Sequence, residues 1–190
     1  MTDKSGRLFD LTIGLPVFNE VEAIRATITG VRDVANSMNL TYEIVAVDDG
    51  SDDGTSEILA ELVSELAEKL RVIRHPYNRG NGAAVKAAIR SARGEVLVLM
   101  DADGQHDPTD IPRLYENVGP YDLVVGARTR KTKGYWPRRT ANLVFDALAS
   151  YLTDFPVKDL TSGFRAVKTD VMLSLIHLLP NKFSYPTTST

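Results

Sequence analysis

The fold of this chain is decided by the stretch Glu95-Val96-Leu97-Val98-Leu99-Met100-Asp101-Ala102-Asp103-Gly104-Gln105-His106. Its apolar first half is typical of a buried β-strand, and the apolar run stops abruptly at two aspartates. Residues i and i+2 of an extended chain point to the same side. We therefore expect the carboxylates of Asp101 and Asp103 to face one point at the mouth of a sheet, with Gln105 two residues further on.

Oxygen ligands gathered in this way suit Mg²⁺ or Mn²⁺, and such an ion usually completes its coordination with substrate phosphates. The stretch therefore indicates chemistry on a nucleotide diphosphate. The alternative is a solvated turn after the strand, because Asp-x-Asp-Gly is also good turn chemistry.

Apolar strand-like runs alternate with helical patterns along the chain, which predicts an α/β fold with a mostly parallel sheet. Strands are expected at residues 11–18, 42–47, 71–74, 95–100 and 123–126. Helices are expected at residues 21–38, 55–69, 83–92, 108–118 and 141–152. Asn19 is expected to cap the first helix, and Ser51 or Asp52 the second.

The composition is that of an ordinary globular domain, with 190 residues, 43% hydrophobic and 25% charged. A net charge of -3 gives no support for a nucleic-acid partner. The absence of cysteine excludes disulfides and thiolate metal sites. We expect one domain over residues 1–190, cut short at its C-terminal end, because residues 181–190 show no periodic pattern.

Polar side chains also follow the first two predicted strands, and ligands of open α/β sheets bind beyond the carboxyl ends of strands. Pro16 and Phe18 could flank a nucleobase, with Glu20 accepting a hydrogen bond. Asp48 or Asp49 could accept a hydrogen bond from a base or a ribose hydroxyl. The alternatives are a strand-to-helix turn and helix capping, although capping explains one of two adjacent carboxylates better than both.

The glycines after the third predicted strand imitate a dinucleotide fingerprint, since Gly80 and Gly82 open a helix. The third position of that fingerprint is Val85, where a close approach to a pyrophosphate needs Gly or Ala. We expect Gly82 to lie near the ribose or sugar of a ligand; a flexible turn is the alternative.

A basic stretch follows at residues 128–139, with Tyr135, Trp136 and Pro137 between its cations. Guanidinium groups bind phosphate oxygens in a planar fork, and aromatic residues beside cations favour a membrane interface or a lipid phosphate. The alternative is a solvated loop. Further on, Arg165 could form an internal pair or contact phosphate. The histidines share no metal-ligand spacing and are treated as structural.

Five motifs occur in the order of one known family. They are Leu15-Pro16-Val17-Phe18-Asn19-Glu20, Val47-Asp48-Asp49-Gly50-Ser51, Asn78-Arg79-Gly80-Asn81-Gly82, Met100-Asp101-Ala102-Asp103-Gly104-Gln105-His106 and Thr161-Ser162-Gly163-Phe164-Arg165. The chain resembles the inverting family 2 glycosyltransferases of GT-A fold, whose central sheet is Rossmann-like and flanked by helices. The most similar branch is the polyprenyl-phosphate hexosyltransferases, such as dolichol-phosphate mannose synthase.

The resemblance implies a role for each motif. A nucleotide site would comprise Pro16, Phe18, Glu20, Asp48, Asp49, Gly82 and Asp101. Asp101, Asp103 and Gln105 would hold Mg²⁺ or Mn²⁺ and the diphosphate. The acceptor phosphate would contact Arg128, Arg138 and Arg139, and the implied catalytic residues are Asp103 and Arg128.

The implied reaction transfers a hexose from GDP- or UDP-hexose to a dolichyl or undecaprenyl phosphate, with inversion, at the cytoplasmic face of a membrane. An ionised phosphate acceptor needs no strong general base, which agrees with the lack of an obvious catalytic histidine. Two alternatives stay open: a saccharide hydroxyl as acceptor, and a catalytically inactive domain that only binds nucleotide sugars. A nucleotide-sugar pyrophosphorylase would instead carry a basic, glycine-rich loop after its first strand.

Overall fold

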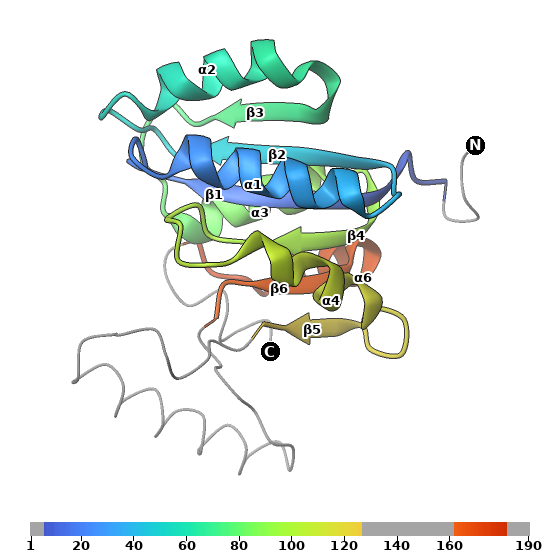
Figure 1. Ribbon diagram of the computed structural model, residues 1–190. Coiled ribbons are helices and arrows are strands. Elements are labelled where there is room, and N and C mark those ends of the chain that lie inside the picture. Colours follow the sequence, from blue (N-terminus) through green and yellow to red (C-terminus); the bar gives the residue numbers. More distant parts are fainter. Residues whose placement is uncertain (1–5, 127–161, 182–190) are drawn as a thin grey trace, which may run out of the picture.

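The computed structural model describes residues 6–126 and 162–181. A six-stranded sheet in the order β3-β2-β1-β4-β6-β5 forms the centre of the molecule (Figure 1). Its strands are β1 (Phe9–Val17), β2 (Tyr42–Asp48), β3 (Leu70–Arg74), β4 (Gly94–Leu99), β5 (Leu123–Val125) and β6 (Arg165–Lys168). The first four strands are parallel, and β6 runs antiparallel to β4 and β5. The predicted α/β fold with a mostly parallel sheet is confirmed.

Helices cover both faces of the sheet (Figure 1). They are α1 (Ile24–Ser37), α2 (Thr55–Leu66), α3 (Asn81–Ser91), α4 (Ile111–Glu116) and α6 (Thr169–Leu175). Alternate strand residues point to opposite faces, so Val98 packs in the core under α1, α2 and α4, whereas Leu97 and Leu99 pack under α3 and α6. Residues 96–99 of β4 are therefore buried on both faces, as a central parallel strand requires.

Strand β6 and helix α6 were not predicted from the sequence, and the last expected strand of the sheet lay at residues 123–126. Strand β6 has four residues and pairs Arg165 with both Leu99 and Val125. Four residues are too few to show a recognisable alternation of apolar and polar side chains. The place of this strand depends instead on pairing with β4 and β5, which are far away in the sequence. The helix expected at residues 141–152 lies outside the described residues.

Both expected helix caps are wrong. Helix α1 begins at Ile24, and Asn19 has a φ of 56° and directs its side chain to Asp52 instead. Helix α2 begins at Thr55 after Gly54, and Asp53, rather than Ser51 or Asp52, accepts a hydrogen bond from the Thr55 backbone N–H. The local preference of Asn and Ser for capping is overridden because these side chains link one loop to another.

The extended geometry expected for Asp101 and Asp103 is also wrong. Strand pairing ends at Leu99, and residues 102–104 form a bend in which Gly104 has a φ of 73°. The pairing of β4 with β1 stops at Gly14, so no ladder keeps the chain extended beyond this point. Asp103 therefore lies within this bend and Asp101 just before it, so neither carboxylate is carried by a strand.

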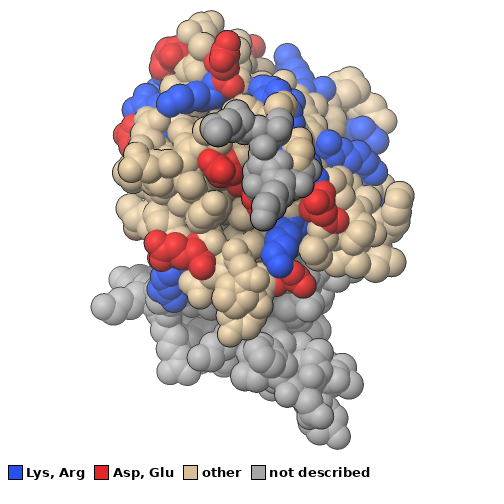
Figure 2. Space-filling view, turned by 90° about the vertical axis from the view of Figure 1, so that its right-hand side faces the viewer, with Lys and Arg blue, Asp and Glu red and all other residues tan. Residues whose placement is uncertain are grey.

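Glu43 is fully buried near the amino ends of the parallel strands. Its carboxylate accepts hydrogen bonds from Thr12 Oγ1 (2.9 Å), from Arg93 Nε (2.9 Å) and from Arg71 Nε (3.0 Å). Burial raises its pKa, but the hydrogen bonds from Arg93, Arg71 and Thr12 outweigh that effect and lower the pKa overall. Figure 2 looks onto this side of the molecule, where acidic and basic side chains lie interspersed.

Replacing Glu43 with Gln is expected to lower the free energy of unfolding at pH 7 by about 2 kcal/mol, because Arg71 and Arg93 lose their charged partner. A carboxyl group with a depressed pKa stabilises the protein above its unfolded pKa of about 4.3 and ceases to do so as the pH falls through the folded value. Urea unfolding should therefore show the difference from the parent shrinking below about pH 4. The exposed Glu116→Gln change is the control, and a difference that does not depend on pH would contradict the ion-pair explanation.

Candidate active site

Five loops meet at the carboxyl edge of the parallel strands, on the left in Figure 1. Four follow β1, β2, β3 and β4, and the fifth, residues 162–164, leads into β6. Because β6 runs antiparallel to β4, its amino end lies at the carboxyl end of β4. The structure thus brings the predicted motifs together from distant parts of the chain, and open α/β sheets bind ligands at such an edge.

The loops after β1 and β2 are joined by reciprocal hydrogen bonds. Asn19 Nδ2 donates to Asp52 Oδ1 (2.9 Å), and the Asp52 backbone N–H donates to Asn19 Oδ1 (3.0 Å). The backbone N–H of Asn19 donates to Ser51 Oγ (3.0 Å), and that of Glu20 donates to Thr55 Oγ1 (2.9 Å). Glu20 is thereby held in place by its backbone, and its carboxylate is left to face the site.

Asp49 holds the loop after β3. Its buried carboxylate contacts His75 Nδ1 at 2.6 Å and accepts hydrogen bonds from the backbone N–H groups of Arg79 (3.1 Å) and Gly80 (2.7 Å). The loop from His75 to Gly80 therefore takes its shape from this one charge.

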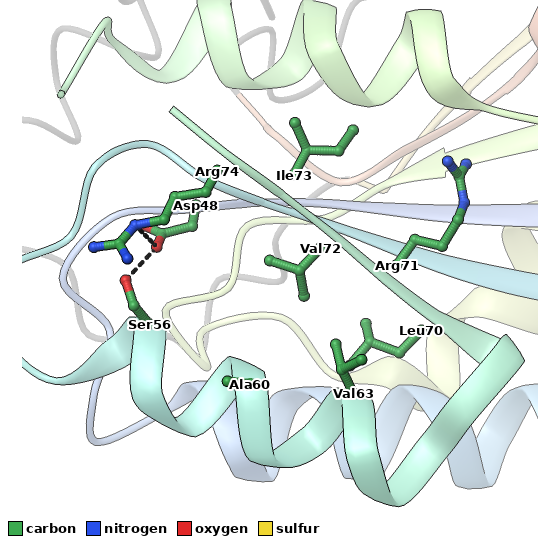
Figure 3. Close-up of a pocket in the computed structure, with 9 residues that line it drawn as sticks. All are labelled: Asp48, Ser56, Ala60, Val63, Leu70, Arg71, Val72, Ile73 and Arg74. Atoms are coloured by element: carbon green, nitrogen blue, oxygen red, sulfur yellow. Dashed lines mark hydrogen bonds and ion pairs between the residues drawn. The ribbon is translucent and has the colours of Figure 1, made fainter. Parts of the chain in front are cut away.

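The neighbouring carboxylate of Asp48 points elsewhere (Figure 3). It accepts hydrogen bonds from the Ser51 backbone N–H (2.9 Å) and from Ser56 Oγ, and Arg74 Nε lies 3.5 Å away. These contacts lie at one end of a groove of about 630 Å³ between α2 and β3. The two adjacent aspartates thus have separate roles: Asp48 secures the turn after β2, and Asp49 secures the loop after β3.

Two aromatic side chains are exposed in these loops. Phe18, after β1, is 42% exposed, and Tyr77, after β3, is 66% exposed. Gly50, in the loop after β2, has a φ of 79°, and a Cβ on it would lie only 2.6 Å from the Tyr77 carbonyl carbon, so this position excludes a side chain. Pro16 is buried within β1 opposite Val47 and so lies beneath the loops, and Gly82 is buried in the first turn of α3.

Asp101 packs directly against the residues that precede β6. A Cβ on Gly163 would lie 2.3 Å from Asp101 Oδ2, so only glycine allows this contact. The same oxygen lies 3.7 Å from His106 Nε2, and the His106 ring packs on Phe164 with 5.1 Å between ring centres. The other oxygen, Asp101 Oδ1, is buried and has no hydrogen-bond partner. A buried carboxylate oxygen without a partner is costly unless a ligand satisfies it.

Glu20 lies in the field of the other acidic side chains. Burial raises its pKa most, and the negative charges of Asp103, Asp53 and Asp101 raise it further. Asp103 Oδ1 accepts a hydrogen bond from the Gln105 backbone N–H (3.0 Å). Such a concentration of carboxylates repels itself and would be relieved by a cation.

The donor atoms fit a divalent cation only if a ligand completes its coordination. Carboxylate oxygens suit Mg²⁺ and Mn²⁺, and Asp101 supplies one that is buried without a partner. Within residues 6–126 and 162–181, however, no three His, Cys, Asp or Glu side chains are close enough together to bind a metal by themselves. The protein therefore offers part of a coordination sphere, as expected where substrate phosphates provide the rest.

Several features of the site escaped the sequence analysis. Besides Asp101 Oδ1, the described side chains include one other buried atom without a partner, Asn81 Oδ1 in the first turn of α3. Tyr77 was also missed, because a single tyrosine within a loop carries no spacing signal. Arg165 is fully buried and its Nε donates to the Ser162 carbonyl (2.8 Å), which supports the internal interpretation of this residue.

The proposed acceptor residues Arg128, Arg138 and Arg139 lie outside the described residues. Within the described ranges, no helix combines the length and the hydrophobicity that a membrane span needs.

Comparison with known proteins places the chain in a family. Residues 12–175 match the family described as Glycosyl transferase family 2. The chain is 30% identical over 183 residues to the undecaprenyl-phosphate 4-deoxy-4-formamido-L-arabinose transferase of Aeromonas hydrophila, covering 92% of this chain and 56% of the relative. It is 28% identical over 165 residues to the dodecaprenyl-phosphate galacturonate synthase of Rhizobium johnstonii, covering 86% of this chain and 49% of the relative. The chain thus spans about half the length of these relatives.

Solved structures share the fold at lower identity. Glucosyl-3-phosphoglycerate synthase from Mycobacterium tuberculosis, in complex with Mn²⁺, UDP-glucose and phosphoglyceric acid, aligns with a TM-score of 0.67 and 22% identity over 97% of this chain and 63% of that one. A mannosyltransferase from Pyrobaculum calidifontis in complex with GDP-Man and Mn²⁺ aligns with a TM-score of 0.67 and 19% identity over 95% of this chain and 50% of that one. The sequence match over residues 12–175, joined to this common GT-A fold, shows that the chain belongs to glycosyltransferase family 2.

Proposed function

We propose that this chain is the catalytic part of a metal-dependent, inverting hexosyltransferase that moves a sugar from a nucleotide diphosphate to a polyprenyl phosphate. The observation that carries the proposal is the group of carboxylates at the carboxyl edge. Asp101 keeps a buried oxygen without a hydrogen-bond partner there, and burial together with the negative charges of Asp103 and Asp101 raises the pKa of Glu20. The names of the family relatives, which specify undecaprenyl- and dodecaprenyl-phosphate, support the choice of acceptor.

The nucleoside of the donor would lie between the loops after β1 and β3. Phe18 and Tyr77 offer exposed aromatic surface there, and Glu20 offers a carboxylate with a raised pKa to a base or ribose. Asp49 shapes this part of the site by holding Arg79 and Gly80, so its effect on the nucleoside would pass through the loop. Pro16, Asp48 and Gly82 would support the same wall from beneath.

Asp101, Asp103 and Gln105 would hold Mg²⁺ or Mn²⁺ beside the diphosphate. The bound cation would supply electrostatic stabilisation for the leaving nucleoside diphosphate. The chain prepares the site in two ways: Gly163 leaves room for the Asp101 carboxylate, and the Gln105 backbone N–H orients that of Asp103. Asp103 is therefore proposed as the catalytic carboxylate, which would act by holding the cation beside the leaving diphosphate.

The acceptor phosphate would contact Arg128 together with Arg138 or Arg139. Because a phosphate is already ionised at neutral pH, its oxygen can attack the anomeric carbon without a strong general base. The two described histidines near the edge are both engaged in contacts within the protein, because His75 contacts Asp49 and His106 packs on Phe164. Neither histidine is therefore assigned as a general base. A membrane-borne acceptor and a nucleotide-sugar donor would place the reaction at the cytoplasmic face of a membrane.

Replacing Asp103 with Asn should weaken UDP or GDP binding at least tenfold in the presence of Mn²⁺, because the metal loses a charged ligand. Isothermal titration calorimetry with and without Mn²⁺ measures the change. Asp107→Asn is the matched control, since that exposed carboxylate in the same loop accepts a hydrogen bond from the Thr109 backbone N–H. Unchanged affinity and unchanged metal dependence in the Asp103 variant would contradict the metal assignment.

Replacing Asp49 with Asn should weaken nucleoside binding even in EDTA, and should lower the melting temperature, because the loop from His75 to Gly80 loses its central charge. Titration with UDP in EDTA and thermal unfolding measure the two effects. The control is Asp110→Asn, which removes an exposed carboxylate that makes no side-chain capping hydrogen bond at the start of α4. A loss confined to metal-dependent binding would show that Asp49 serves the metal instead.

Replacing Arg128 and Arg138 with Ala should abolish transfer to polyprenyl phosphate while nucleotide binding is retained. The loss of two charge-assisted contacts, each worth about 1.5–3 kcal/mol, is large enough to be seen in a transfer assay. Lys131→Ala with Lys133→Ala removes the same charge from the same stretch and serves as control. If the parent ignores lipid phosphates but modifies a saccharide hydroxyl, the acceptor class is wrong; if it only binds the donor, the domain is not an enzyme.

A further inference from the structure

A basic groove lies on the outer side of α3. It has a volume of about 220 Å³ and is lined by His75, Arg79, Ala83, Lys86, Ala87, Arg90 and Asn181. It adjoins the candidate active site at His75 and Arg79, which both contact Asp49, and extends along α3 from there. The lining contains three cationic side chains and no Asp or Glu. A small concave surface with this charge is suited to an anion of the size of a phosphate group.

The cations of this basic groove lack the acidic partners that most other surface cations of the described residues have. Elsewhere Arg25 pairs with Glu61 and Glu65, Arg32 with Asp33, and Lys168 with Asp122. Among the residues that the structure describes, no Asp or Glu forms an ion pair with Arg79, Lys86 or Arg90. Their charge is therefore available to an external anion.

Hydrogen bonds fix the walls of the basic groove. Lys86 Nζ donates to Asn181 Oδ1 (2.7 Å), and the backbone N–H of Ala83 donates to the Asn181 carbonyl (2.8 Å). On the other side, Asp49 holds His75 and the backbone of Arg79. The one carboxylate nearby is thus buried and engaged, and the groove keeps its shape without a ligand.

Exposed aliphatic side chains lie on the same face of the sheet. Helices α3 and α6 pack on one shared core cluster, and Leu178, just after α6, is 68% exposed. Leu175 is 39% exposed at the end of α6. On the opposite face, α1 carries arginines that pair with acidic residues of the protein itself. Cations and exposed leucines on one face are typical of a surface that contacts a lipid interface.

We propose that the face formed by α3 and α6 docks onto an anionic membrane, with a lipid headgroup phosphate in the basic groove and Leu175 and Leu178 against the acyl boundary. The inference rests on the proposed function in that a lipid acceptor requires the enzyme to work at a membrane. Beyond the proposed function, it identifies the face of α3 and α6 as the surface that contacts the membrane. A free phosphate compound would use the cations but would leave the leucines without a role.

Vesicle co-sedimentation of the full chain tests this surface. Vesicles of phosphatidylcholine with 30% phosphatidylglycerol should bind the protein, and pure phosphatidylcholine should bind it far less. Lys86→Gln with Arg90→Gln should weaken binding to the anionic vesicles about thirtyfold, which corresponds to about 1 kcal/mol for each cation at the membrane surface. The matched control, Arg25→Gln with Arg32→Gln, removes the same charge from α1 and should change binding much less. Leu175→Ser with Leu178→Ser should also weaken it.

Equal losses in the two charge variants would show that net charge alone drives binding, and would overturn the proposal. It would equally be overturned if the parent ignored the vesicles while glycerol 3-phosphate, titrated by calorimetry, bound to the parent and not to the Lys86 and Arg90 variant. UDP binding with Mn²⁺, measured on the same preparations, separates this inference from the proposed function. If the parent protein binds UDP but not the anionic vesicles, only the proposed surface is refuted. If the parent and variants show the expected vesicle pattern but the parent does not bind UDP, only the donor site is refuted.

Discussion

The buried carboxylate of Asp49 is the interaction on which the shape of the carboxyl edge depends. It lies at the end of β2, and its partners are His75 and the backbone N–H groups that lead into α3. A buried charge is tolerated only when it is fully hydrogen-bonded, so the loop must close around it. The same closure exposes Tyr77 toward the edge and fixes one wall of the basic groove, which links the candidate active site to the α3 surface.

A second constraint is the proximity of like charges. Asp101, Asp103, Asp53 and Glu20 all lie at this edge, and the raised pKa of Glu20 reports the cost, with burial as its largest cause. A protein selected for stability alone would separate these groups. Their retention together with a buried Asp101 oxygen that lacks a partner is what favours a cation and a phosphate ligand over a solvated turn.

Strand β6 explains why so distant a motif belongs to the site. Its antiparallel pairing with β4 sets Arg165 opposite Leu99, which carries Gly163 against Asp101 and Phe164 against His106. The opposite end of the sheet is organised differently, since Glu43 satisfies two arginines there and its pKa is lowered. Charges are thus neutralised at the amino ends of the strands and left in excess at the carboxyl ends.

The sequence by itself determined the α/β class with a mostly parallel sheet, and the family, because buried strands and the motifs that follow them are local patterns. It also indicated that Asp48 and Asp49 need separate explanations. Only the tertiary structure decided that Asp48 secures a turn while Asp49 holds the loop after β3, that Asn19 links loops instead of capping a helix, and that the chain leaves the strand before Asp101 and bends at residues 102–104. Strand β6 and the basic groove were likewise beyond the sequence. The reason is the same in each case: the partners that fix these side chains come from other strands and helices, and no local preference specifies which loop a hydrogen bond will reach.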